Sequence, residues 1–347
     1  MRAPRQEPLF DLVGPHCGTC EVAAECGAAT TKYACPPGWS TPGYGGQNTL
    51  HPDCPNAAER IASVHGFQLK AYRARPLKIP ELPGYIPQFR WREALAGHLH
   101  GPVYAVRPQA ILRKGRIRTA AEVRAYLKLG SKQLLVLLLF DEDELLEHFY
   151  DPRVASQLAK AGYDLVVSAS YSIWWPRPRM HQLYNMSRSL ALCIALQKLD
   201  VPAVPRIDWV FAHDVSRWVA WIEENPCVGL VAIDAQTSKG SSSSSWRQLL
   251  AGLEEFDRRT GGRLRYLING PATEGRWAEI YNILSPDRVT LTDARLHEAE
   301  PPTEQERFLF SVPRGKGIDW GRCYPARVER RQAEIVTAQE RALADVA

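Results

Sequence analysis

Short apolar runs alternate with amphipathic segments from about residue 102 onward. The apolar runs are PVYAVRP, QLLVLLLF, YDLVVSAS, PAVPRIDW, VGLVAIDA, LRYLING and RVTLTD. The segments between them have apolar residues at helical spacing and cover residues 119–130, 142–162, 178–199, 214–225, 243–259 and 273–284. The pattern therefore predicts seven strands separated by helices.

Each predicted helix is long enough to connect two parallel strands by a right-handed crossover. Many consecutive units without a glycine-rich dinucleotide turn favour a closed barrel over an open doubly wound sheet, which is the alternative. The apolar run FLFSVP at 308–313 is a candidate for an eighth strand. We predict an α/β fold, a (β/α)8-like barrel of the TIM type, over residues 101–313.

The rest of the chain has a different character. Residues 1–57 are rich in Gly, Pro, Cys and Thr and have too few apolar side chains to hold a core by burial alone. Residues 58–100 contain a short helix and then a proline-punctuated stretch, which suits an extended strap. Residues 314–347 predict a charged helical tail that is solvated or packs on the barrel.

Charge and hydropathy indicate which cellular compartment and which kinds of partner to expect. The formal net charge is +5, a mild basic bias, and no apolar run approaches the ~20 residues of a membrane span. The N-terminus lacks the apolar core of a secretory signal. We expect a cytoplasmic protein with no membrane association, in which clustered cysteines are metal ligands more often than disulfides. No pattern indicates an oligomeric state.

Five of the eight cysteines lie between residues 17 and 54. A CxxC pair gives two thiolates that reach one metal from a single turn, and a third cysteine six residues later returns from the next turn. The spacing resembles that of cysteines holding a [4Fe–4S] cluster in several actinobacterial proteins, and a structural Zn²⁺ site, disulfides or unpaired thiols are the alternatives. The predicted ligands are Cys17, Cys20 and Cys26, with Cys35 or Cys54 completing the set.

Polar residues at the carboxyl ends of barrel strands are the best candidates for catalysis, because the strand fixes them where loops admit substrate. Asp208 and Asp234 each end an apolar strand, and we predict that they serve as acid and base or as nucleophile. Ser170 and Asn269 end two further strands and complete the predicted catalytic set. The alternative is that the carboxylates cap the following helices.

The segment that follows the third strand predicts a binding surface. Arg177 and Arg179 precede or begin a helix, where the amide groups and the helix dipole favour a phosphate. His181, Asn185 and Arg188 follow at positions i, i+4 and i+7 of that helix and share one face, which is either a substrate face or an ordinary surface. Trp209 and Gln236, at other strand ends, complete the predicted binding residues.

The run from SASYSIWWPRPRMHQLYNMSRSL to VGLVAIDAQT, with YLINGPAT downstream, resembles the phage-, plasmid- and actinobacteria-associated domain of unknown function 4417. The resemblance covers about residues 100–295 and implies no established activity. Ser170 stands where that family has an acid. More distantly, a barrel with strand-end acids and a cysteine-bound metal is similar to tRNA-guanine transglycosylases, which use aspartates for base exchange.

Three hypotheses for function follow. The first is a metal-cluster barrel enzyme that modifies or exchanges a nucleobase in DNA or RNA, because basic segments and tryptophans are frequent near loops. The second is a binding protein that holds nucleic acid without turnover. The third is a barrel hydrolase of a small phosphorylated or glycosidic substrate.

Overall fold

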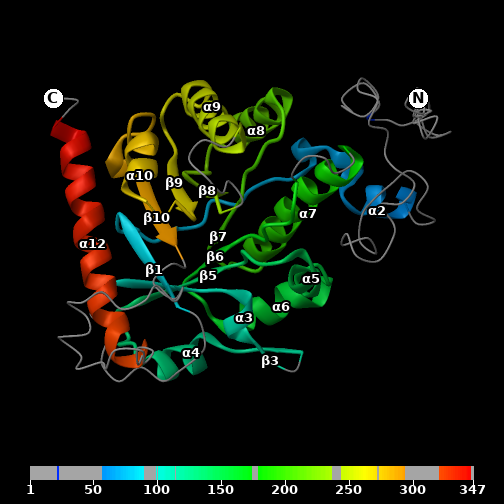
Figure 1. Ribbon diagram of the computed structural model, residues 1–347. Helices are drawn as coiled ribbons and strands as arrows, with labels where there is room; N and C mark the ends of the chain where they lie inside the picture. The colour runs from blue at the N-terminus through cyan, green and yellow to red at the C-terminus, as the bar shows by residue number, and fades with distance from the viewer. Residues whose placement is uncertain are drawn as a thin grey trace, which may run out of the picture.

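The computed structural model describes residues 57–89, 101–113, 115–173, 179–236, 244–271, 273–293 and 320–344, together with Val22 and Leu99. Its centre is an eight-stranded parallel sheet in the order β7-β6-β5-β2-β1-β10-β9-β8 (Figure 1). The strands are β1 Tyr85–Phe89, β2 Val103–Val106, β5 Leu134–Leu138, β6 Leu165–Val167, β7 Ala203–Val204, β8 Leu230–Asp234, β9 Arg265–Asn269 and β10 Val289–Asp293.

The two edge strands of this sheet meet just beyond β7. Arg206 forms a parallel bridge with Ala232 of β8. The Ile207 amide donates to the Ala232 carbonyl at 2.8 Å, and the Ala232 amide donates to the Pro205 carbonyl at 2.9 Å. The sheet is therefore a nearly closed barrel of parallel strands, and the predicted barrel fold is confirmed.

The eighth strand differs from the expected one. The candidate at 308–313 lies outside the described residues, and β1 completes the barrel by pairing with β10 and β2. It comes from the stretch that we expected to be part of a strap, so the barrel begins before residue 101. Pro87 in the middle of β1 explains the difference. Proline has no main-chain N–H to donate to a neighbouring strand, so a sequence that contains it does not resemble a central strand.

Helices surround the barrel, and their bounds follow the sequence pattern except over 142–162, where α5 Asp143–Leu146, a 3-10 helix Glu147–Phe149 and α6 Pro152–Ala161 replace one expected helical segment. Local capping sets several ends: Thr119 and Glu122 form a capping box at the start of α4, and Asp151 caps α6, which ends at the left-handed Gly162. The longer helices are α2 Ala57–Ser63, α4 Ala120–Leu127, α6 Pro152–Ala161, α7 Arg179–Lys198, α8 Ala212–Glu224, α9 Ser244–Arg259, α10 Glu274–Tyr281 and α12 Trp320–Ala344. Shorter elements are α3 Pro108–Ile111, α5 Asp143–Leu146 and the antiparallel pair β3 Leu112–Arg113 and β4 Arg116–Ile117.

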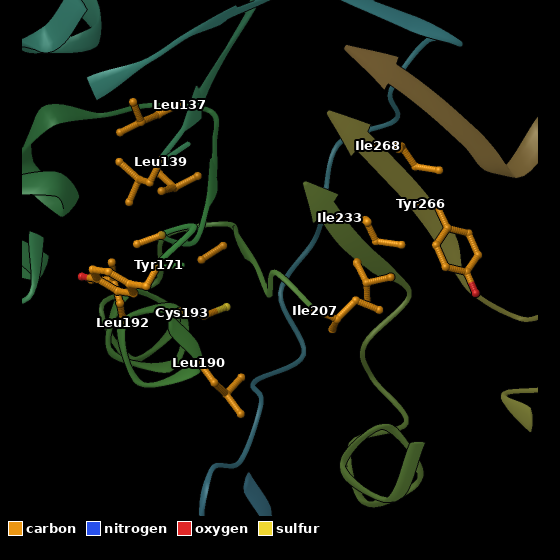
Figure 2. Close-up of a cluster of buried hydrophobic side chains, with 14 of the residues drawn as sticks. Leu137, Leu139, Tyr171, Leu190, Leu192, Cys193, Ile207, Ile233, Tyr266 and Ile268 are labelled. Carbon is orange, nitrogen blue, oxygen red and sulfur yellow. The ribbon is translucent and has the colours of Figure 1, made fainter. Parts of the chain in front are cut away.

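Side chains alternate between two apolar layers along each strand. The outer layer joins the barrel to the helices, and Figure 2 shows part of it, with Cys193 of α7 next to Leu190 and Leu192. The inner layer fills the barrel axis, and we call it the lumen cluster. Its buried members are Ile86, Val103, Ala105, Val136, Leu138, Phe140, Leu165, Val167, Val204, Leu230, Ala232 and Leu267.

Two further segments cover the barrel, one at its amino end and one at its side. Residues 73–84 run along the amino ends of the strands, where Ile79 and Leu82 pack against the lumen cluster. The C-terminal helix α12 packs against α10 and β1 (Figure 1), and the Tyr324 hydroxyl donates to the Gln88 carbonyl at 2.8 Å. None of the described helices is both long and apolar enough to cross a membrane.

Candidate active site

The inward-facing positions change from apolar to polar at the carboxyl ends of the strands. In β1, Gln88 follows the lumen residue Ile86 by two positions, and in β9 Asn269 follows Leu267 in the same way. Asp234 at the end of β8 follows Ala232. Because side chains two apart in a strand point to the same face, these polar groups form a ring above the lumen cluster.

Hydrogen bonds join this ring into a continuous line across four strands and one loop. Gln88 Nε2 donates to Asn269 Oδ1 at 2.5 Å and to Thr292 Oγ1 at 3.1 Å. Asn269 Nδ2 donates to Asp234 Oδ1 at 3.0 Å. Ser170 Oγ donates to the other carboxylate oxygen of Asp234 at 2.7 Å. The line fixes the orientation of each side chain.

Asp234 is the common acceptor of the site. Beside Ser170 and Asn269, the main-chain amide of Gln236 donates to Asp234 Oδ1 at 3.1 Å. The carboxylate is half-buried, so part of it still faces solvent or a substrate. Three donors from β9, the loop after β6 and its own loop therefore hold Asp234 in one orientation.

A glycine lets the loops after β8 and β9 approach each other. Gly270 has a φ of +104°, and a Cβ there would lie 2.6 Å from Gln236 Cγ and 2.7 Å from the Gln236 amide nitrogen. Arg107, after β2, donates to Gln236 Oε1 at 2.8 Å and to the Phe140 carbonyl at 2.7 Å. Gln236 is thus held between β2 and β9 at the edge of the ring.

Arg206 and Asp208 follow β7 and form an ion pair. The pKa of Asp208 is raised to about 6 mainly by burial; the Arg206 guanidinium opposes this rise, and the carboxylates of Asp214 and Asp234 add to it. Apart from this ion pair with Arg206 Nη1, neither Asp208 oxygen has a hydrogen-bond donor within the described part of the chain, and the buried Arg206 Nε has no acceptor there. The site therefore holds an acid and a donor with unused hydrogen-bonding capacity.

The structure brings all four predicted catalytic residues, and Gln236, to this end of the barrel. The sequence-based set omitted four residues of the ring, which are Gln88, Arg107, Arg206 and Thr292. Arg206 stands two positions before Asp208, so the strand alternation that selected Asp208 also places Arg206 on the inward face. Gln88 had no such indication, because its strand was not recognised.

The arginines expected to hold a phosphate are engaged elsewhere. Arg179 forms a buried bidentate ion pair with Asp214 of α8, and Arg188 forms an ion pair with Glu147 at 2.5 Å. Arg188 also stacks on the Tyr171 ring, with its guanidinium carbon 3.5 Å from the ring centroid. Arg179 therefore joins α7 to α8, and Arg188 joins α7 to Glu147 and to the loop after β6. Arg177 lies outside the described residues.

The remaining predicted binding residues are also packed inside. His181 and Asn185 are buried on α7, where Asn185 Nδ2 donates to the Ser172 carbonyl at 2.6 Å and lies 3.0 Å from His181 Nε2. Trp209 lies against α9, with its ring stacked on Phe256 and its Nε1 donating to the Gln248 carbonyl at 3.3 Å. The face of α7 that carries His181 and Asn185 is thus an interior face.

The predicted metal ligands Cys17, Cys20, Cys26, Cys35 and Cys54 lie outside the described residues, so the [4Fe–4S] or zinc centre stays a prediction. Within the residues that the structure does describe, no group of three or more His, Cys, Asp or Glu side chains could hold a metal ion.

No family model matches the chain, and no curated protein matches it. The likenesses to domain of unknown function 4417 and to transglycosylases therefore stay predictions. Among solved structures, the chain is similar to a tryptophan synthase alpha chain from Legionella pneumophila, at 11% identity and a TM-score of 0.40 over 81% of this chain and 97% of the other. It is also similar to a 4-hydroxy-2-oxoglutarate and 2-dehydro-3-deoxyphosphogluconate aldolase from TTHB1, at 12% identity and a TM-score of 0.35 over 74% and 92%. A mandelate oxidase matches at 14% identity and a TM-score of 0.37 over 68% and 65%.

The predicted function as a metal-cluster enzyme acting on nucleic acid is wrong. The matched structures named above are an aldolase, a synthase subunit and an oxidase, not enzymes that act on nucleic acid. The arrangement of charge agrees with this correction, because Arg179 and Arg188 are buried in ion pairs. Nucleic-acid binding relies on exposed cations that release counterions from phosphates.

Proposed function

We propose that this protein is an acid–base enzyme that removes and returns a proton on the carbon atom next to the carbonyl group of a small polar molecule. The observation that carries the proposal is the pair of Asp208 and Arg206 at the carboxyl end of the barrel. Asp208 is a buried carboxyl group that is paired with Arg206 Nη1, and its Oδ1 has no donor among the described residues. Arg206 Nε is a buried donor that has no acceptor among those residues. Such groups are rare in native interiors unless a ligand or water satisfies them.

Asp208 is the proposed proton acceptor. Its pKa of about 6 means that the carboxylate is mostly ionised at pH 7 and still basic enough to take a proton. Desolvation causes most of this rise, so an ordinary exposed aspartate would be a weaker base. Once protonated, the same carboxyl group can return the proton to the substrate or product.

Arg206 is the proposed stabiliser of the negative charge that forms on the substrate oxygen. Its NH1 group donates to the Tyr171 carbonyl at 2.9 Å, which fixes the guanidinium, while Nε stays available. A fixed cationic donor in a buried setting stabilises a developing enolate without reorganisation of solvent. Asp208 and Arg206 are thus arranged for the removal of a proton and the stabilisation of the resulting charge.

Asp234 is the proposed positioning acceptor for the substrate. Its orientation is set by Ser170, Asn269 and Gln236, and it is half-buried at the end of the neighbouring strand. A fixed carboxylate in this place accepts a hydrogen bond from a hydroxyl group of the substrate. The proposed substrate is therefore a hydroxy-carbonyl compound.

The size and charge of the substrate follow from the surroundings. The lumen cluster fills the barrel axis below the ring, so a ligand lies at the rim and not deep in the barrel. Arg107 and Arg206 balance Asp208 and Asp234 in formal charge. A near-neutral rim favours a substrate that carries no more than one charge.

The test is solvent deuterium incorporation. The full-length protein is incubated in D2O with dihydroxyacetone, glyceraldehyde, lactaldehyde and pyruvate, and the exchange of the proton next to the carbonyl is followed by proton NMR against a protein-free sample. We expect catalysed exchange with at least one hydroxy-carbonyl compound. Asp208→Asn should lower it by about 100-fold or more, in line with the usual contribution of one general base.

Glu254→Gln is the matched control, because it removes one acidic charge from an exposed position of α9. This variant should exchange at the wild-type rate. Wild-type protein that exchanges none of the four compounds faster than buffer, or an Asp208→Asn variant with full activity, would contradict the proposal.

A further inference from the structure

A second feature with binding capacity lies at the opposite, amino end of the barrel. A cavity of about 450 Å³ opens there between the strand beginnings and the segment 81–83. Its size falls within the range of small-molecule sites. Its lining residues are Glu81, Leu82, Pro83, Pro102, Val103, Lys132, Leu134, Leu230, Arg265, Asp287, Arg288 and Thr290.

Part of the wall of this cavity is apolar. Val103, Leu134 and Leu230 begin β2, β5 and β8, and each belongs to the lumen cluster or packs against it. Leu82 closes one side from the segment that crosses the amino ends. The body of a ligand in this cavity would therefore contact hydrocarbon on several sides.

Arg265 is a cation of this cavity whose side chain has no ion-pair partner among the described residues. Arg265 begins β9 two positions before Leu267, a lumen residue, and so faces inward. The side chain is half-buried, and within the described part of the chain it makes no hydrogen bond or ion pair. A half-buried guanidinium beside apolar walls loses part of its hydration, and an ion pair with an anion would compensate for that loss.

The other charged groups of the lining limit the charge of that anion. Arg288 is already paired with Asp257 at 2.7 Å, so it is committed to the protein. Lys132 is an exposed second cation, and Glu81 and Asp287 are exposed acids. One available inward cation, with further charges of both signs, matches a single negative charge better than the double charge of a phosphate.

We propose that this cavity binds a small amphipathic monoanion, namely a carboxylate with an apolar body. The carboxylate pairs with Arg265, and the apolar body lies against Val103, Leu134 and Leu230. This site is separate from the ring at the carboxyl ends and does not depend on the function proposed for that ring.

Isothermal titration calorimetry of the full-length protein with octanoate tests the site. Octanamide is the uncharged probe with the same apolar body, and inorganic phosphate is the charged probe that has no apolar body. We expect octanoate to bind at least about tenfold more tightly than either of the other two, the usual effect of one charge-assisted hydrogen bond. Octanamide or phosphate binding as tightly as octanoate would overturn the proposal, as would no octanoate binding at all.

Two variants locate the site. Arg265→Gln should raise the dissociation constant of octanoate by about tenfold or more, and Lys132→Gln, at an exposed position that tolerates change, by a smaller factor. Arg247→Gln is the matched control, because Arg247 is an exposed arginine of α9 that does not line the cavity. If Arg265→Gln unfolds, Leu134→Trp should block the cavity and abolish binding. Unchanged octanoate binding in a folded Arg265→Gln or Leu134→Trp variant would overturn the assignment.

Discussion

The Ser170 hydroxyl donates a hydrogen bond to Asp234 Oδ2 at 2.7 Å, although the two residues are 64 positions apart in the chain. Ser170 follows β6 and Asp234 ends β8, so the bond passes over the position of β7. The contact depends on the curvature of the barrel, and it sets the orientation of the carboxylate that we assign to substrate positioning.

Ser170→Ala removes one of the three donors to Asp234. We expect the deuterium exchange rate to fall by about fivefold, because one hydrogen bond contributes roughly 1 kcal/mol to the orientation of the acceptor. Ser172→Ala is the control, since the Ser172 hydroxyl has no hydrogen bond within the described part of the chain. An equal loss in both variants would contradict a specific role for the Ser170 hydroxyl.

Asp208→Asn changes how stability depends on pH. The pKa of Asp208 lies near 6 in the folded protein, against an ordinary value of 3.8. Between these values the folded state keeps a proton that the unfolded state has lost, so rising pH destabilises the wild type. The free energy of unfolding of the wild type minus that of Asp208→Asn should fall by roughly 2 kcal/mol from pH 4 to pH 6.5 and then level off.

Chemical denaturation at a series of pH values measures this difference. The variant also leaves Arg206 without its partner, but Arg206 stays charged throughout this range and adds only a constant offset. A difference that is flat from pH 4 to pH 6.5 would show that Asp208 has an ordinary pKa, and a difference that rises would show a lowered pKa; either result contradicts the prediction.

Gly270→Ala should destabilise the protein and distort the ring. A Cβ at Gly270 would lie 2.7 Å from the Gln236 amide nitrogen and 2.8 Å from Gln236 Cα, and the φ of +104° is strained for any side chain. We expect a loss of about 2 to 4 kcal/mol, because strain and the displacement of backbone add together. Thermal and urea unfolding measure it.

Gly275→Ala is the control for that change. Gly275 lies in α10 with nothing within 4 Å of the added Cβ, so alanine there should be neutral or stabilise by about 0.5 kcal/mol. If the two alanine variants unfold alike, the close approach at Gly270 does not shape the site.

Arg179→Met tests whether this arginine is structural. Both partners of the Arg179–Asp214 pair are almost completely buried, so the variant removes the nearer cation from a buried carboxylate that keeps only Arg217, at 3.7 Å, among the described arginines. We expect a loss of about 3 to 5 kcal/mol in the free energy of unfolding. Adding Asp214→Asn should recover part of it, because the amide oxygen still accepts from the Val210 and Phe211 amides but carries no charge. A fully stable Arg179→Met variant would contradict a structural role.

The cysteine cluster predicts a metal. Protein purified without oxygen should be brown, with about four iron atoms per chain for a [4Fe–4S] centre, or colourless with about one zinc for the alternative. Cys17→Ser and Cys20→Ser should lower the metal content. Cys227→Ser, an exposed cysteine outside the cluster, should leave it unchanged. Wild-type protein without stoichiometric iron or zinc would contradict the prediction.

The barrel could be predicted from the sequence because both faces of a parallel strand are buried. A strand packed between the lumen cluster and the helices needs apolar residues at nearly every position, and runs such as LLVLLLF satisfy this without reference to any partner. The same local rule placed Asp208 and Asp234 at strand ends, where the apolar run stops but every second side chain still points inward.

Contacts between distant segments decided the rest. Pro87 made β1 look irregular, and only its pairing with β10 and β2 shows it to be a strand that brings Gln88 into the ring. Arg179 and Arg188 appeared in the sequence as available charges, and only the packing of α7 against α8 and the barrel pairs them with Asp214 and Glu147. A residue's own neighbours in sequence determine its propensity and its face, whereas its partner, its burial and the pKa of Asp208 depend on groups that folding brings from far along the chain.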